Sequence, residues 1–307
     1  MKPLVSVIVP NYNHARFLEK RIQSILSQTF KGFEVILLDD ASTDGSLEIL
    51  RKYANHPLVS GFVPSDRNSG SPFGQWATGL SLSSGKYVWI AESDDFAAEN
   101  FLEVLTCVLE SNAEVGMVYC DSDVVDENDD IRMRNPDGAL TPSSFEMTGE
   151  EFLQRYLYYK CAVPNVSGTL MRRQSIEATG FIPSNFRYVG DWMFWIRFFE
   201  TGTGVRFVNQ KLNYFRTHSG TTRSFSSLRK FGDYMIESFS VLHYSKRTGK
   251  ADPVGIDARM DFLARKISNR FPIASLIGSN GRSLIRRLIP YDPKVTYRIL
   301  RQKLVRR

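Results

Sequence analysis

The sequence predicts an α/β fold with a mostly parallel sheet flanked by helices, and two observations carry this prediction. Short apolar runs alternate with longer segments in which apolar residues recur every three or four positions. Turn residues such as Asn, Asp, Gly and Pro separate these segments. Strands that alternate with amphipathic helices are typical of right-handed βαβ units, which build a parallel sheet. The alternation holds from Val5 to Cys120, so we expect this stretch to form the first half of the fold.

The individual elements follow from the same spacing. Strands are expected at 5–9, 33–38, 59–63, 87–91 and 115–120. Helices are expected between them, around 18–26, 44–53, 73–82 and 102–109. Each strand ends in a polar turn, and each helix shows one apolar face, as a helix packed on a sheet must.

After Cys120 the alternation breaks into a polar, turn-rich segment. Thr148 and Glu151 form a capping box that predicts a helix through residue 159, and an apolar helix is expected from Asp191. Further strands are expected at 166–171, 205–208 and 212–216. The remaining chain is predicted to be helical with a basic tail. We therefore expect a domain over 1–222, with halves 1–120 and 121–222, followed by a helical extension over 223–307.

Composition and charge exclude several classes of protein. Cys107, Cys120 and Cys161 form no CxxC pair, which argues against a disulfide framework and a zinc site. No signal peptide precedes the first strand, and no apolar run approaches the roughly 18 residues that span a bilayer. A cytoplasmic protein is therefore expected. Residues 282–307 contain nine Lys or Arg residues and one Asp, whereas the net charge of the whole chain is only +6. The basic charge thus lies in the tail, and a nucleic-acid partner is not indicated.

Acidic side chains follow the strand 87–91 at the point where it ends. Glu92, Asp94 and Asp95 place three carboxylates within four residues, and these repel one another unless a cation or hydrogen-bond donors compensate them. Polar residues also end the first and second strands: Tyr12, Asn13, Asp39 and Asp40. Because parallel strands end at one edge of a sheet, these groups can converge on a phosphorylated ligand and a divalent cation. Taken singly, each is equally compatible with a turn or helix cap.

Three stretches closely resemble the family 2 glycosyltransferases with the GT-A fold: VSVIVPNYNHARFLEKRIQSILSQTF, VILLDDASTDGS and RNSGS…SGKYVWIAESDD. The resemblance is strongest over 3–120 and continues to about residue 220. It implies a Rossmann-like sheet and the transfer of a sugar from a nucleotide diphosphate, such as a UDP-sugar, to a hydroxyl group with inversion. Such transfer serves cell-surface polysaccharide or glycolipid biosynthesis, and Mn²⁺ or Mg²⁺ is the implied cofactor.

The resemblance also implies roles for individual residues. The nucleotide-binding positions would be Pro10, Tyr12, Asn13, Asp40, Asn68 and Asp94. The metal would be held by Asp95, Asp94 and His218. The donor sugar or the acceptor would contact Ser167, Gly168 and Trp192. Asp191 matches the catalytic base. Glu92 stands where many relatives have Asp, which leaves open whether it ligates the metal.

Two other functions stay open from the residues. A nucleotidyltransferase uses a related sheet, but the turn 10–14 offers no Lys or Arg cluster for phosphates. A non-catalytic nucleotide-sugar-binding protein on this fold would bind without turnover. The expected acceptor is a saccharide or a lipid-linked molecule. Apolar and cationic residues alternate in the tail. This pattern suggests that the tail lies on the inner face of an anionic membrane; it is equally typical of a helix packed on the fold.

Overall fold

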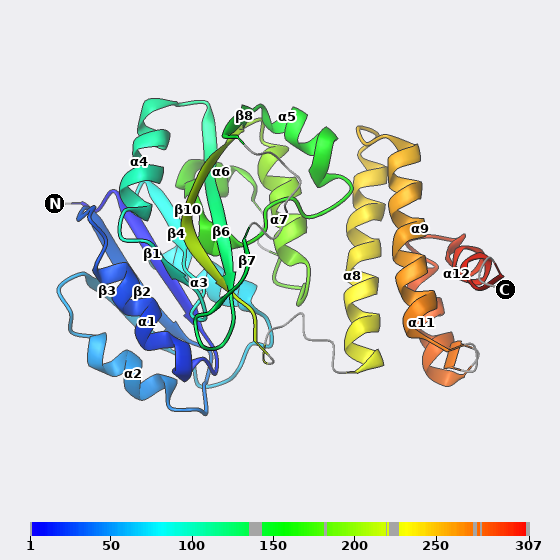
Figure 1. Ribbon diagram of the computed structural model, residues 1–307, viewed down its shortest axis with the longest axis horizontal. Coiled ribbons are helices and arrows are strands. Elements are labelled where there is room, and N and C mark those ends of the chain that lie inside the picture. Colours follow the sequence, from blue (N-terminus) through cyan, green and yellow to red (C-terminus); the bar gives the residue numbers. More distant parts are fainter. Residues whose placement is uncertain are drawn as a thin grey trace.

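A ten-stranded sheet forms the centre of the computed structural model, with the strand order β3-β2-β1-β4-β9-β6-β10-β5. Strand β7 pairs with β6 and strand β8 with β10. The structure describes residues 2–134, 143–180, 183–218, 220, 227–272, 275–276 and 278–304. Helices cover both faces of the sheet, and a group of C-terminal helices stands beside it (Figure 1).

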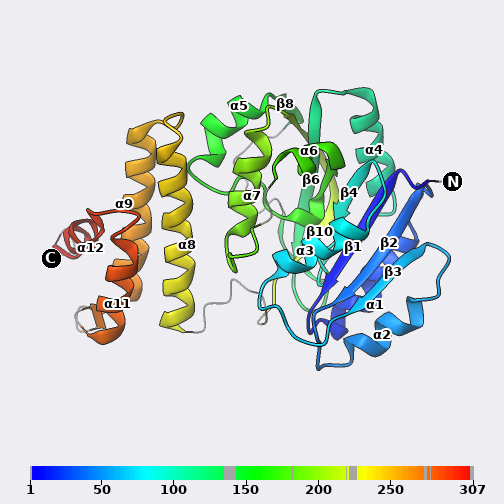
Figure 2. The same cartoon turned by 180° about the vertical axis from the view of Figure 1, so that it is seen from behind.

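The first half of the sheet is parallel, as predicted. Its strands are β1 (Val5–Asn11), β2 (Phe33–Asp39), β3 (Val59–Pro64) and β4 (Tyr87–Ile90). Their connecting helices are α1 (Ala15–Leu26), α2 (Ser46–Tyr53), α3 (Pro72–Leu82) and α4 (Phe101–Ser111). Alternate residues of a strand face opposite sides, so Val7 packs with α1 while Ile8 packs with α3. Figure 2 shows α3, α6 and α7 on the face opposite α1 and α2.

The second half of the sheet contains antiparallel pairs. Its long strands β6 (Val115–Val125) and β10 (Gly204–Arg216) are parallel to each other, and β9 (Thr169–Arg172) runs antiparallel between β4 and β6. Short antiparallel strands complete it: β5 (Phe96–Ala97), β7 (Ile131–Arg134) and β8 (Phe145–Met147).

Three details differ from the predicted elements. The strands expected at 205–208 and 212–216 are one strand, β10, with register shifts between Val208 and Asn213. The strand expected at 166–171 begins as a short 3₁₀ helix, Val166–Gly168. Strand β6 continues five residues beyond Cys120, so the boundary predicted at residue 120 falls inside a strand. The boundary predicted at residue 222 lies outside the described residues.

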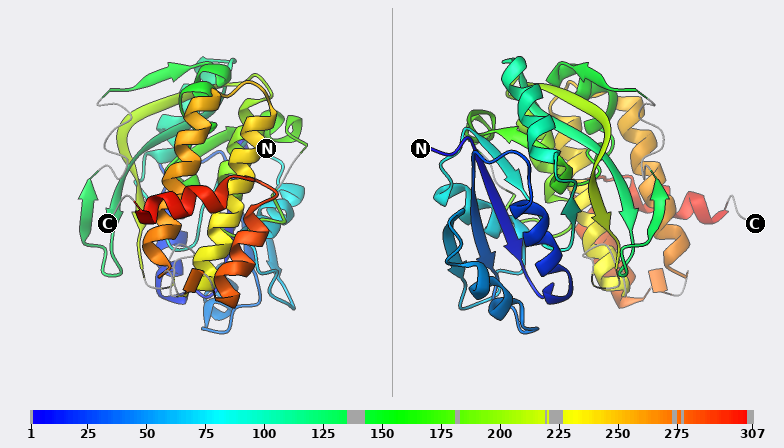
Figure 3. Two further views of the ribbon diagram at one scale, coloured as in Figure 1. Left: turned by 90° about the vertical axis from the view of Figure 1, so that its right-hand side faces the viewer. Right: turned by 60° about the vertical axis from the view of Figure 1, so that its left-hand side comes forward.

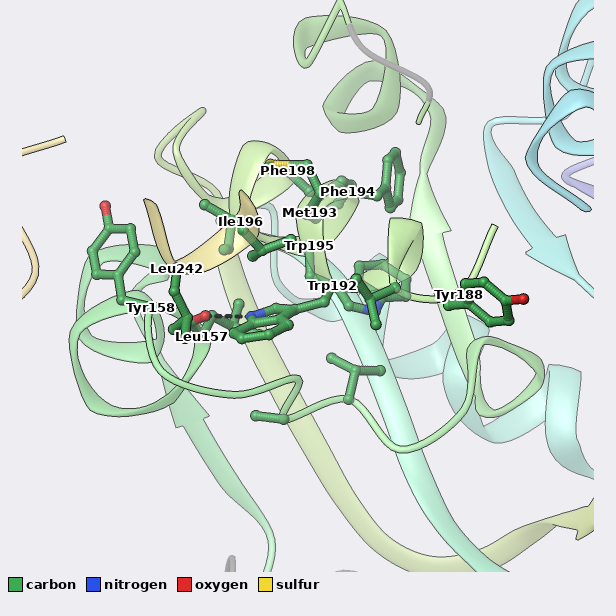
Figure 4. Packing of buried hydrophobic residues seen from close by; sticks show 14 of the residues in the cluster. Leu157, Tyr158, Tyr188, Trp192, Met193, Phe194, Trp195, Ile196, Phe198 and Leu242 are labelled. Carbon is green, nitrogen blue, oxygen red and sulfur yellow. Dashed lines mark hydrogen bonds between the residues drawn. The ribbon is translucent and has the colours of Figure 1, made fainter. Parts of the chain in front are cut away.

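Helix α7 (Gly190–Phe199) is the most deeply buried helix segment near the site. It packs beside α5 (Gly149–Phe152), which the predicted capping box of Thr148 opens and a π-helical turn (Leu153–Leu157) continues. Helix α6 (Arg173–Ala178) lies on the same face. Aromatic side chains of α7 are buried on both sides of the helix, and Trp195 is fully enclosed. Figure 4 shows this packing, which fixes the position of the first turn of α7.

The C-terminal extension consists of α8 (Leu228–Arg247), α9 (Pro253–Arg270), α11 (Ser279–Leu288) and α12 (Val295–Leu304). Figure 3 shows α12 lying across α9, while α11 runs beside α8. One hydrophobic cluster contains residues of α3, α7, α8 and α9, so the extension shares the core of the second half.

The tail packs on the extension through its apolar side chains. Leu284, Leu288, Val295 and Ile299 are buried, which removes them from any membrane contact, whereas Tyr297 and Leu300 are exposed. The largely buried Arg298 pairs with carboxylates from α9 and the preceding turn: Asp257, Asp261 and Asp292. No helix in the described part of the chain is long and apolar enough to cross a bilayer.

Candidate active site

Three side chains that can bind a metal come together at the carboxyl edge of the sheet. His14 follows β1, Asp94 follows β4, and His218 follows β10. One potential ligand atom from each lies within 4.8 Å of the others. His218 Nε2 is 3.1 Å from Asp94 Oδ2, and the two imidazole rings meet edge to face at 5.4 Å. These three elements are far apart in sequence, so the fold assembles the cluster.

The protonation of the cluster suits a cation. Burial lowers the pKa of His14, and the nearby His218 lowers it further, so the imidazole stays neutral and keeps a lone pair for a ligand bond. Burial alone would raise the pKa of Asp94. The hydrogen bond from His218, together with the electrostatic influence of the two nearby histidines, outweighs this and holds the pKa of Asp94 below its usual value. The cluster therefore offers a carboxylate and the neutral His14 ring to a cation.

Asp95, predicted to be a metal ligand, is anchored by two hydrogen bonds within the chain. Its side chain is 2% exposed, and each oxygen already accepts a hydrogen bond: Oδ2 from Asn165 Nδ2 at 2.9 Å, and Oδ1 from the backbone N–H of Arg216 at 2.9 Å. Burial and the charge of Asp94 raise the pKa of Asp95 to about 6. The structure therefore brings Asp94, and not Asp95, together with His218.

Asp40 holds the loop 68–71 in place. Its buried carboxylate accepts hydrogen bonds from Asn68 Nδ2 at 3.0 Å, from the backbone N–H of Ser69 at 3.0 Å and from Gln75 Nε2 at 2.9 Å. Both oxygens are thus used within the chain. Asp40 and Asn68, both predicted to bind the nucleotide, form one hydrogen-bonded unit in which Asp40 orients Asn68 and Ser69.

The turn after β1 presents one exposed aromatic ring. Tyr12 is 45% exposed, while Pro10 is buried within β1. Asn13 adopts a positive φ of 55°, and its Oδ1 accepts a hydrogen bond from the backbone N–H of Thr43 at 2.7 Å. Asn and Asp tolerate this backbone region better than other side chains. Asn13 therefore fastens the turn to the loop after β2 and leaves the Tyr12 ring facing solvent.

Glu92 lies behind the cluster rather than in it. Its Oε1 accepts a hydrogen bond from Trp76 Nε1 at 3.0 Å, and its backbone N–H donates to Ser167 Oγ at 3.1 Å. Burial, and then the charge of Asp94, raise the pKa of Glu92 to about 8. Ser167 and Gly168 are themselves buried. Ser167 thus holds the end of β4, and neither of these two predicted sugar contacts lies on an open surface.

Asp191 lies in the first turn of α7, where the helix dipole stabilises a negative charge. Its Oδ1 accepts a hydrogen bond from the backbone N–H of Trp192 at 2.8 Å, and Cys161 Sγ is 4.0 Å from Oδ2. Trp192, predicted to contact the donor sugar or the acceptor, is buried in the structure. Its ring is 3% exposed, and its indole N–H donates to the carbonyl of Leu157 at 2.6 Å (Figure 4). Trp192 is a core residue.

A comparison with protein families decides the identity of this arrangement. The sequence profile described as "Glycosyl transferase family 2" matches residues 6–180, more than half of the chain. The chain belongs to glycosyl transferase family 2. The predicted family, its GT-A fold and its glycosyl-transfer activity are thereby confirmed.

Curated relatives of this family 2 transferase come from several bacteria. "Glycosyltransferase GlyG" of Streptococcus pneumoniae is 28% identical over 72% of this chain and 73% of that protein. "Cholesterol galactosyltransferase" of Borreliella burgdorferi is 32% identical over 79% of this chain and 64% of its own length. "Putative glycosyltransferase EpsE" of Bacillus subtilis is 32% identical over 65% of this chain and 68% of that protein.

Solved structures show the same fold. TarS 1–349 of S. aureus, in complex with UDP-GlcNAc, has a TM-score of 0.68 at 19% identity and covers 97% of this chain and 82% of that one. Mannosyltransferase PcManGT of Pyrobaculum calidifontis, in complex with GDP-Man and Mn²⁺, has a TM-score of 0.59 at 20% identity over 99% of this chain and 85% of that one. At these identities the likeness establishes the fold alone.

The sequence interpretation missed two residues of the candidate site, His14 and Arg21. His14 is within the quoted motif, yet nothing local shows that it meets Asp94. Arg21 is fully buried, and none of its guanidinium nitrogens has a hydrogen-bond partner in the described structure. It lies 4.7 Å from the Trp89 ring and provides a positive charge beneath Asp95. The burial of Arg21 could have been noticed in the sequence, because position 21 falls on the buried face of α1.

Proposed function

We propose that this protein is an inverting glycosyltransferase that moves a sugar from a nucleotide diphosphate, in the first instance a UDP-sugar, to a hydroxyl of a saccharide or lipid-linked acceptor. The product would belong to a cell-surface polysaccharide or glycolipid. The observation that carries the proposal is the convergence of His14, Asp94 and His218 at the carboxyl edge of the sheet. The TarS complexes with UDP and UDP-GlcNAc, and the names of the curated relatives, support the donor and product classes.

The donor atoms of the cluster fit Mn²⁺ better than Mg²⁺. Magnesium prefers oxygen ligands in an octahedron, while imidazole nitrogen suits transition metals. His14 Nδ1 lies 2.8 Å from Ser93 Oγ, which leaves Nε2 for a ligand bond and fixes the ring. We therefore assign the cation to His14, Asp94 and His218, with Asp95 as a positioning residue. When bound, the cation neutralises charge on the leaving diphosphate.

Asp191 is the proposed general base. The acceptor oxygen attacks the anomeric carbon, its proton moves to the Asp191 carboxylate, and the bond from that carbon to the diphosphate oxygen breaks. One displacement from the opposite face inverts the anomeric centre. The start of α7 keeps this carboxylate ionised, and the buried aromatic side chains behind it hold it in place.

The parallel half of the sheet is proposed to hold the nucleotide. The exposed ring of Tyr12 offers a flat surface on which a base stacks. Asn68, which Asp40 orients, is proposed to contact the nucleotide from the loop 68–71. We propose that residues 1–222 form the catalytic unit. The C-terminal helices are an extension that completes its hydrophobic core.

Membrane association is a separate proposal about α12. The support is the exposed pair Tyr297 and Leu300 beside Arg301. Deleting the tail would remove buried core residues, so the sharper test is the double substitution Tyr297→Ser and Leu300→Ser. Weaker binding to anionic vesicles with unchanged thermal stability is the expected result. Unchanged vesicle binding would contradict the proposal.

The test of the function is hydrolysis of a panel of nucleotide sugars with Mn²⁺ and no acceptor. We expect one UDP-sugar to be cleaved slowly to UDP and free sugar, with the activity lost in EDTA. Binding of UDP-sugars without any turnover would favour a non-catalytic binding protein. Release of pyrophosphate from a nucleoside triphosphate would favour a nucleotidyltransferase.

A further inference from the structure

A groove of about 550 Å³ lies between the loop that precedes α7 and the first turns of α8, with α11 at its side. Its walls include three arginines and three aromatic rings: Phe186, Arg187, Tyr188, Arg229, Arg287 and Tyr291. A second hollow, of about 690 Å³, adjoins it at Arg287 and passes Arg282 and Arg286 on α11. In Figure 1 the first turns of α7 and α8 both lie toward the lower edge, where β10 ends.

The groove is firmly joined to the segment that carries Asp191. The carboxylate of Glu237 on α8 accepts three hydrogen bonds from consecutive backbone N–H groups, those of Arg187 at 2.9 Å, Tyr188 at 2.8 Å and Val189 at 3.0 Å. The next residue, Gly190, has no room for a side chain, because a Cβ there would lie 2.5 Å from the Phe73 ring. Tyr188 and Asp191 are three residues apart, at most about 11 Å along the chain. The groove and the residue proposed as the base are therefore joined by a short stretch of chain that Glu237 fixes.

The charges of the groove favour an anion. Arg287 pairs with Asp233 at 2.8 Å, and Glu237 is occupied by the backbone. Arg187 and Arg229 are exposed and form no ion pair within the described part of the chain, and the same holds for Arg282 and Arg286 in the adjoining hollow. Guanidinium groups bind phosphate and carboxylate through paired N–H donors, which gives both affinity and orientation.

The aromatic residues make the groove more than a charged surface. Phe186 and Tyr291 are only partly buried and flank the arginines, and such rings offer an apolar face to a ligand. Small-molecule sites commonly combine such faces with a few charged groups. A sugar ring that carries one negatively charged substituent matches both features.

We propose that this groove is the acceptor site and that the acceptor is a saccharide bearing a phosphate or carboxylate group. Arg187 and Arg229 bind the anion, Tyr291 packs on the sugar ring, and Glu237 is a positioning residue that holds the groove against α7. The assignment rests on the proposed function, because the groove serves an acceptor only if Asp191 activates a hydroxyl there.

The experiment measures the binding of glucose 1-phosphate, glucuronic acid and glucose by saturation-transfer NMR and calorimetry. UDP and Mn²⁺ are kept saturating, so that the donor site is filled and the probes report on the groove. We expect both anionic sugars to bind more tightly than glucose. The double variant Arg187→Glu, Arg229→Glu should bind them about tenfold more weakly or worse, since each loses a charge-assisted hydrogen bond. Arg247→Glu, at the far end of α8, is the matched control and should bind as wild type.

Each failure has a separate meaning. UDP affinity is measured first in every variant, and absence of UDP binding by the wild type would contradict the proposed function. Retained UDP binding with equal affinity for glucose and the anionic sugars would overturn the groove assignment. If the double variant still bound the anionic sugars as tightly as the wild type, the groove assignment would also be overturned. Binding to phosphatidylglycerol vesicles without binding to the phosphosugar would assign the groove to a lipid surface and overturn the saccharide acceptor.

Discussion

The two halves of the sheet build the site in different ways. In the parallel half, β1 to β4 end in polar turns that contact the neighbouring turn, as Asn13 contacts Thr43. In the mixed half, single residues reach across more than a hundred positions, as His218 does to Asp94 and Arg216 to Asp95. The first half therefore resembles a preformed binding edge that already holds His14 and Asp94, while the second half brings His218 and Asp191 to it. Each prediction below separates these two contributions.

The largest effect is expected in the mixed half, from Asp191→Asn. This change preserves size and most capping ability but removes the proton acceptor. Turnover should fall by about a hundred- to ten-thousand-fold, while donor affinity stays within a few-fold. Steady-state kinetics and UDP-sugar calorimetry measure the two quantities. Asp252→Asn, at the N-cap of α9, is the matched control. Lost donor affinity with normal turnover at saturation would make Asp191 a binding residue.

Arg216→Met tests how the mixed half is anchored. The buried guanidinium donates to the carbonyls of Asp94 and Asp126, so its removal leaves buried acceptors without donors. We expect a loss of about 2–4 kcal/mol in the free energy of unfolding, measured by urea denaturation. Arg132→Met removes an exposed ion pair from the same half and should cost under about 1 kcal/mol. Equal costs for the two variants would show that Arg216 is not an anchor.

Tyr12→Ala tests the binding role of the parallel half. Loss of a stacking surface should weaken UDP affinity by about tenfold, since base–aromatic stacking contributes about 1–3 kcal/mol. Turnover at saturating donor should stay near the wild-type value, because Tyr12 touches no reacting atom in the proposed mechanism. A variant with normal UDP affinity and reduced turnover would reverse the roles of the two halves.

Glu92→Gln is expected to have the smallest effect, on the pH dependence of stability. Burial raises the pKa of Glu92 to about 8 in the folded state, from 4.5. Between about pH 4.5 and 8 the folded protein then binds more protons than the unfolded one. The free energy of unfolding therefore falls as the pH rises through this range. In EDTA, the wild type should lose thermal stability between about pH 6.5 and 8, above the pKa of Asp95. Glu92→Gln should show a flatter profile; an identical slope would place the titrating group elsewhere.

The sequence predicts the parallel half well because its signals are local. Strand–helix alternation and turn residues identify β1 to β4 and their helices, and the strand-end position of Asp94 follows from them. The mixed half depends on distant partners. Nothing near Asp95 in the sequence shows that Asn165 and Arg216 donate hydrogen bonds to its oxygens. An aromatic residue at a helix start does not reveal which side it faces, so the burial of Trp192 cannot be predicted from the sequence alone.

The central claim is that the two halves meet at one cation site. Electron paramagnetic resonance of Mn²⁺, titrated in the presence of UDP, tests it most directly in the wild type and in His14→Ala, His218→Ala and His56→Ala. His14 and His218 come from different halves, while His56 lies in the turn before β3 and serves as the control. We expect the Mn²⁺ dissociation constant to rise about tenfold or more in the first two variants and to stay unchanged in the third. Dissociation constants within twofold of the wild type in both His14→Ala and His218→Ala would contradict the account.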